Sequence, residues 1–126
     1  MKEYQVDVNG GFEGPEGNGA WTRQTHTGQE FGEIFVPQGW TAYWKEGGTV
    51  PWDPSNDQGF GRPEMHVIEF EGAYQEPVPR IHSGHWAFKC FTTYRVHDAG
   101  LYRVIDVPPD GVIEMAAWVH GWASTS

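Results

Sequence analysis

The stretch from Val112 to Trp122, V-I-E-M-A-A-W-V-H-G-W, has the clearest pattern in this chain. Its residues alternate with a period of two, which is typical of a β-strand whose two faces meet different surroundings. One face is aliphatic and predicts contact with a hydrophobic core; it consists of Ile113, Met115, Ala117 and Val119. The other face carries three large rings, those of Trp118, His120 and Trp122. The stretch therefore predicts an all-β protein with an aromatic stripe near its end.

Three interpretations of this aromatic stripe are open. Indole faces stack on the C–H faces of sugar rings, so the stripe fits a carbohydrate site. It also fits a second small core, covered by the segment between Trp44 and Glu64. A third interpretation places it in an interface between subunits, where Trp and Arg are favoured.

The composition agrees with an all-β fold. The chain has 126 residues, which is the size of one domain, and we expect residues 1–126 to form a single β-sandwich. The chain contains 17 glycines and 9 prolines, which favour turns. It also contains 7 tryptophans, 5 tyrosines and 7 phenylalanines, whose large rings can fill the interior of a β protein. The single cysteine, Cys90, excludes an internal disulfide, and its apolar neighbours predict a buried thiol.

Turn residues divide the chain into short strands. Strands are predicted over Glu3–Val8, Phe31–Val36, Trp40–Trp44, Glu64–Glu71, Trp86–Tyr94, Leu101–Val107 and Val112–Trp122. Loops are predicted over Glu13–Gln29 and Lys45–Arg62, which are rich in Gly, Pro, Asn and Thr. Pro108-Pro109-Asp110-Gly111 is a hairpin turn signal. This punctuation favours an antiparallel β-sandwich.

Charge and motifs exclude several classes of function. The net charge of -9 argues against a nucleic-acid partner. The sequence has no apolar run of the ~20 residues that a membrane span needs, and no signal peptide is visible. It also has no Gly-x-Ser-x-Gly, phosphate-loop or dinucleotide motif, so we do not expect an enzyme.

Four motifs in order resemble the galactose-binding-domain-like jelly roll of many carbohydrate-binding modules. These are Asn9-Gly10-Gly11-Phe12-Glu13, Pro37-Gln38-Gly39-Trp40, His82-Ser83-Gly84, and Pro109-Asp110-Gly111 leading to Ala117-Trp118-Val119. The resemblance implies an extracellular or virion-surface protein that binds polysaccharide. Members of that family continue for one or two further strands, so the resemblance also implies that the last strands are lacking or are supplied by a neighbouring subunit.

The candidate site residues follow from the stripe, the loops and the resemblance. Besides Trp118, His120 and Trp122, the rings of Trp44 and Trp52, near or in the predicted loop, are candidates for stacking. Candidate hydrogen-bonding partners for sugar hydroxyls are Arg80, His82, Arg103 and Glu64. Glu13 holds the position that ligates a structural Ca²⁺ in many resembling modules, although the aspartate that the family adds from its closing strand is lacking here.

The sequence thus leads to two hypotheses. The first is a non-catalytic module that binds carbohydrate through an aromatic face. The alternative is a structural protein, such as a virion decoration or an extracellular filament subunit, that uses the same face and an open sheet edge for self-assembly.

Overall fold

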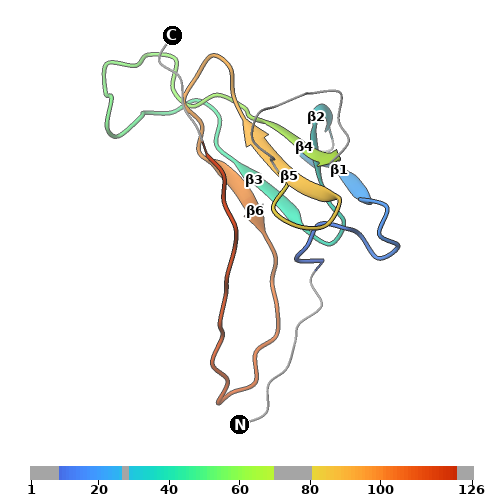
Figure 1. Cartoon of the computed structure of the whole chain (residues 1–126). Helices are drawn as coiled ribbons and strands as arrows, with labels where there is room; N and C mark the ends of the chain where they lie inside the picture. The colour runs from blue at the N-terminus through green and yellow to red at the C-terminus, as the bar shows by residue number, and fades with distance from the viewer. Residues whose placement is uncertain (1–8, 27–28, 70–80, 122–126) are drawn as a thin grey trace.

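The computed structural model of the chain describes residues 9–26, 29–69 and 81–121, and these ranges contain six strands and no helix (Figure 1). The strands are β1 (Trp21–His26), β2 (Gln29–Pro37), β3 (Thr41–Trp44), β4 (Glu64–Glu69), β5 (Trp86–Phe91) and β6 (Ala99–Tyr102). Consistent with this, the described ranges hold no helix that is long and apolar enough to cross a bilayer.

The strands form two sheets. The larger sheet has the order β1-β2-β4-β5, and the smaller one pairs β3 with β6. All of these pairs are antiparallel except β2 with β4, which meet in parallel at Ile34 and Met65. This arrangement agrees with the predicted all-β fold and with a β-sandwich.

A small hydrophobic core lies between the sheets. Ile34 and Val36 of β2 and Met65 of β4 are fully buried, and around Ile34 and Val36 burial alternates with the side-chain period of two. Partly buried residues of the other strands pack against them, namely Ala42, Trp44, Phe88, Cys90, Ala99 and Leu101. Because these residues come from both sheets, the core joins the two layers.

Four predicted strands are confirmed with small changes in their ends, but the predicted loop over Glu13–Gln29 is wrong in its second half. The segment W-T-R-Q-T-H forms β1 and pairs with β2 from Trp21 opposite Pro37 to His26 opposite Gln29. This strand lies at the sheet edge and is rich in polar residues, so it lacks the apolar alternation that marks a buried strand. The predicted strand Leu101–Val107 is confirmed only at Leu101 and Tyr102, because β6 ends there and residues 103–107 form no strand. The predicted strand Glu3–Val8 lies outside the described residues.

The predicted strand over Val112–Trp122 is wrong as far as the structure describes it. Residues 112–121 form no β-bridge; they are the returning leg of a long arm, residues 103–121, that extends from the end of β6 beyond the two sheets (Figure 1). The predicted turn at its tip is present, and the Gly111 N–H donates to the Pro108 carbonyl at 2.8 Å. The alternating pattern indicates a segment with two different faces, but a β-strand also needs a neighbouring strand that hydrogen-bonds to its backbone.

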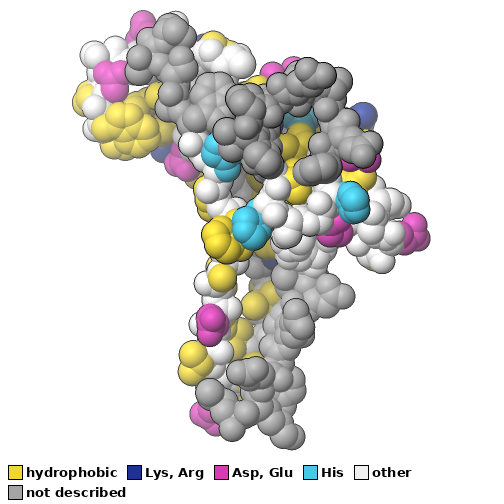
Figure 2. All heavy atoms as spheres, viewed as in Figure 1, with side chains coloured by type: hydrophobic (Ala, Val, Ile, Leu, Met, Phe, Trp, Pro, Cys, Tyr) yellow, Lys and Arg dark blue, Asp and Glu magenta, His cyan; other side chains and the backbone are white. Residues whose placement is uncertain are grey.

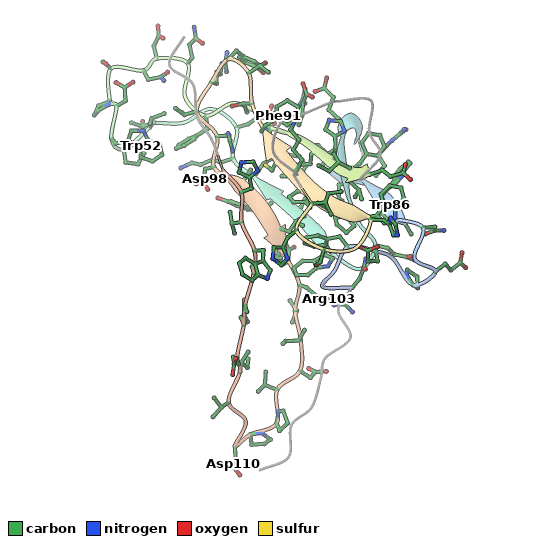
Figure 3. The ribbon with its side chains drawn as sticks, in the orientation of Figure 1. Trp52, Trp86, Phe91, Asp98, Arg103 and Asp110 are labelled. Atoms are coloured by element: carbon green, nitrogen blue, oxygen red, sulfur yellow. The ribbon has the colours of Figure 1, made fainter. Side chains whose placement is uncertain are left out.

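The arm is covered with exposed apolar residues, so the core contact predicted for its aliphatic face is also wrong. Its exposed large side chains are Val104, Val107, Val112, Ile113, Met115, Trp118 and Val119. Figure 2 shows these hydrophobic side chains running along the arm below the body of the protein. Figure 3 places Arg103 where the arm leaves β6 and Asp110 at its tip.

Candidate functional site

The aromatic stripe meets the body of the protein at one stacked pair of rings. The indole of Trp118 lies parallel to the imidazole of His82, with centroids 4.0 Å apart and an angle of 10° between the planes. Trp118 is nevertheless 80% exposed, because His82 covers only one face of its ring. The opposite face of the indole is therefore open to a ligand. We call this pair the ring platform.

The loop that carries His82 is held by the carboxylate of Glu13. The backbone N–H of His85 donates to both oxygens of Glu13, at 3.1 and 3.2 Å, and the N–H of Trp86 donates to Oε1 at 3.2 Å. Gly84 permits this approach, since its φ is +72° and a Cβ there would overlap Oε1 of Glu13. A carboxylate bound to backbone donors is a strong anchor, and these hydrogen bonds to the turn before β5 do not depend on the side chains at positions 85 and 86.

Glu13 is positioned in turn by the ring of its neighbour Phe12. That ring packs edge-on against Trp40, with centroids 5.7 Å apart, and tilted against Phe88 of β5 at 6.2 Å. The Trp40 indole also donates from Nε1 to the Asn9 carbonyl at 3.2 Å. The segments that carry the family resemblance near the start of the chain thus support the loop under the ring platform.

The structure brings only part of the predicted site together. Trp44 belongs mainly to the core, because it packs against the buried cluster between the sheets and its Nε1 donates to Glu46 at 3.3 Å. Trp52 is exposed on the loop after β3, where it packs edge-on against Phe60 at 5.7 Å. In Figure 3, Trp52 and Arg103 lie beyond opposite ends of the antiparallel pair β3 and β6.

The remaining candidates have other surroundings. His120 is exposed on the arm beside Trp118 in the sequence. Arg103 is also exposed, and its guanidinium lies against the turn at Gly39. Glu64 is half-buried at the start of β4, with Oε2 3.3 Å from Nε2 of His66. Arg80 and Trp122 lie outside the described residues.

The interpretation of the stripe as a second small core is wrong for Trp118 and His120, which are both exposed. The long loop between β3 and β4 does not cover them; this loop builds a separate cluster of its own around Val50 and Phe60, both buried. Gly47 and Phe60 pair across this loop, and the ammonium of Lys45 lies 4.7 Å from the Phe60 ring centre. The loop also contacts the segment after β5, since the Gly61 N–H donates to the Val96 carbonyl at 2.9 Å and the Arg95 guanidinium donates to the Gln58 carbonyl at 3.3 Å.

A row of rings on the outer face of the larger sheet was not predicted from the sequence. Trp21 of β1 meets Phe35 of β2 edge-on at 4.5 Å, Phe35 lies 6.1 Å from His66 of β4, and His66 lies 6.0 Å from Phe91 of β5. Cross-strand ring pairs of this kind stabilise sheets. The alternation of Phe35 with Ile34 and Val36 in the sequence indicates that Phe35 lies on the outer face of its strand. The alignment of the four rings depends on pairing between strands that are distant in the sequence, which the sequence pattern does not predict.

The predicted calcium site stays a prediction. The part of the chain that the structure describes has no group of three or more His, Cys, Asp or Glu residues that suits a metal ion. At Glu13, both oxygens accept hydrogen bonds from backbone amides. The observed role of this carboxylate is to fix the loop.

Cys90 has the environment of a packing residue. It lies on β5 against the core cluster, and burial raises the pKa of its thiol from 9.0 to about 11. The thiolate is therefore scarce at neutral pH, which makes a nucleophilic role unfavourable.

Comparison with known proteins gives no relative. No family model, no curated protein and no solved structure matches the chain.

Proposed function

We propose that the protein binds carbohydrate, and that a sugar ring stacks on the open face of Trp118. The observation that supports this most directly is the His82–Trp118 stack, which holds an indole parallel to a second ring while leaving it 80% exposed. A ring that is already oriented loses little conformational entropy when a ligand binds. Aromatic stacking then contributes on the order of 1 kcal/mol beyond the buried area.

The negative net charge of the chain favours neutral carbohydrates over polyanionic ones as ligands. With a net charge of -9, the protein repels polyanions over distances up to the ~8 Å Debye length of physiological salt. Neutral polysaccharides are therefore the expected ligands. Exposed donors of the neighbouring segments, such as the imidazole of His120 on the arm, are available to hydroxyl groups.

The proposal extends to the finer fold. The Glu13 anchor and the loop after Ile81 occupy two of the segments in which the sequence resembles the galactose-binding-domain-like jelly roll, whereas Ala117-Trp118-Val119 forms no strand. We propose that family of folds, and an extracellular or virion-surface location, on this resemblance. The absence of catalysis stays a prediction.

Affinity electrophoresis in gels that contain soluble xylan, mixed-linkage β-glucan or galactomannan tests the proposal. The wild-type protein is expected to be retarded by at least one of these neutral glycans. Trp118→Ala is expected to weaken the interaction about tenfold or more, since stacking and buried apolar area are both lost. Trp118→Phe keeps a flat face and should retain most of the affinity.

Tyr94→Ala is the matched control, because Tyr94 is 70% exposed and belongs to neither the arm nor the loop at His82. It should leave retardation unchanged, and circular dichroism should show both variants folded. Equal retardation of Trp118→Ala and wild type would refute the ring platform as the site. Failure of the wild type to interact with any neutral glycan would refute the function.

A further inference from the structure

The arm, residues 103–121, presents more apolar surface than a stable single chain normally leaves in water. Val104, Val112, Met115 and Val119 are each more than 80% exposed, and Val107 and Ile113 add to them. Isolated exposed apolar side chains are common, but a continuous set on one projecting segment marks an interaction surface. Trp118 is left out of this set because it belongs to the ring platform.

We propose that the arm pairs with the arm of a second copy of this chain, so that the protein forms a two-fold symmetric dimer. This inference goes beyond carbohydrate binding and does not depend on it. In such a dimer the same patch lies on both subunits, and each apolar arm covers the other.

The area of the arm is sufficient for this contact. Burial of a Val, Ile or Met side chain removes on the order of 100 Å² from water. The four most exposed of these side chains therefore bury about 800 Å² in two copies, and the half-exposed Val107 and Ile113 add about 200 Å². The total of about 1,000 Å² reaches the area that a biological interface is expected to clear.

The backbone of the returning leg supports the same partner. Residues 112–121 keep the period-two alternation of a strand, yet they form no β-bridge within the described chain. An extended leg of this kind satisfies its amide and carbonyl groups when it adds to another strand. The equivalent leg of a second copy offers the same alternation.

Other surfaces of the described chain match the arm less well. The large exposed apolar residues outside the arm, Trp21, Tyr43, Trp52, Tyr94 and Tyr102, belong to different strands and loops. Trp21 belongs to the row of rings on the larger sheet, and Tyr43 and Tyr102 lie on the paired strands β3 and β6, so none of the five stands on a projecting segment with an unpaired backbone. A second arm is therefore the best complement to the first.

Sedimentation equilibrium of the full chain between about 1 and about 100 µM tests the proposal. The wild type is expected to reach twice the chain mass of 14.2 kDa. Met115→Glu should raise the dissociation constant about 100-fold, because it places a charge inside the contact. Since Met115 is 87% exposed in the single chain, this substitution should not unfold it.

Tyr94→Glu is the control, with similar chemistry at an exposed site outside the arm, and it should leave the dimer intact. A wild-type protein that stays monomeric at about 100 µM would overturn the proposal. The arm would then contact the sheets of its own chain or a different protein. A dimer that survives both Met115→Glu and Val112→Glu would also overturn it, because the contact would lie elsewhere. Glycan retardation of Met115→Glu separates the two proposals, since this variant should still bind glycan.

Discussion

The anchor between Glu13 and the loop at Gly84 makes a quantitative prediction for a double-mutant cycle. Gly84 has a φ of +72°, where alanine costs about 1.5 kcal/mol, and a Cβ there would overlap Oε1 of Glu13. Displacement of the carboxylate weakens its charge-assisted hydrogen bonds with His85 and Trp86, which adds about 1.5 kcal/mol. Gly84→Ala should therefore destabilise the protein by about 3 kcal/mol.

Removal of the carboxylate should make the same alanine easier to accommodate. Glu13→Ala alone should cost about 2 kcal/mol, since two backbone donors lose a charged acceptor but remain close to water. In the double variant only the backbone strain of the new alanine is added, so its cost should be about 3.5 kcal/mol rather than about 5. The expected coupling free energy is about -1.5 kcal/mol.

Urea unfolding followed by circular dichroism measures all four corners of this cycle. Gly17→Ala is the control, because Gly17 has a φ of +67° but no atom lies within 4 Å of the position that a Cβ would take. It should cost about 1.5 kcal/mol, and its effect should add to that of Glu13→Ala. Additivity of Glu13→Ala and Gly84→Ala within about 0.5 kcal/mol would refute the proposed anchor.

Two further predictions concern the core and its thiol. Met65→Ala should destabilise the protein by about 2–5 kcal/mol in urea unfolding, because Met65 is fully buried, whereas Met115→Ala should change the stability of the dilute monomer by less than about 0.5 kcal/mol. Equal effects of the two methionine substitutions would contradict the assignment of core and arm. Because the pKa of Cys90 is raised to about 11, its alkylation by iodoacetamide should be slow at pH 8 and should rise toward pH 11. Alkylation at pH 8 as fast as that of a free thiol would argue against the burial of Cys90. In the unfolded chain the thiol loses its proton near pH 9.0, before the folded protein does. The contribution of Cys90 to the free energy of unfolding should therefore fall as the pH rises from 9 toward 11.

The sequence was sufficient to predict the strands with a buried apolar face. Ile34, Val36 and Met65 alternate with more exposed neighbours, and their strands lie close to the predicted ranges. Strand β1 was missed because it is an edge strand made largely of polar residues. It is stabilised by backbone hydrogen bonds with β2, and these leave no hydrophobic pattern in the sequence.

The residues after Val112 show the opposite failure. Their alternation of apolar and aromatic side chains is as regular as that of any strand, but alternation does not supply a neighbour for the backbone. The same limit applies to the candidate site. The sequence singled out both Trp118 and His82, while their contact depends on how the arm and the loop before β5 lie in space.

The anchor at Glu13 also has a consequence for which positions of the loop can vary. Its partners at positions 85 and 86 are backbone amides, and these are present whatever side chains the loop carries. Ser83 and His85 are both exposed, so a library randomised at these two positions should keep the fold while it alters the chemistry beside the indole. Because the tether is made to backbone amides, substitutions at these two positions change the surface beside Trp118 while the hydrogen bonds that hold the loop persist.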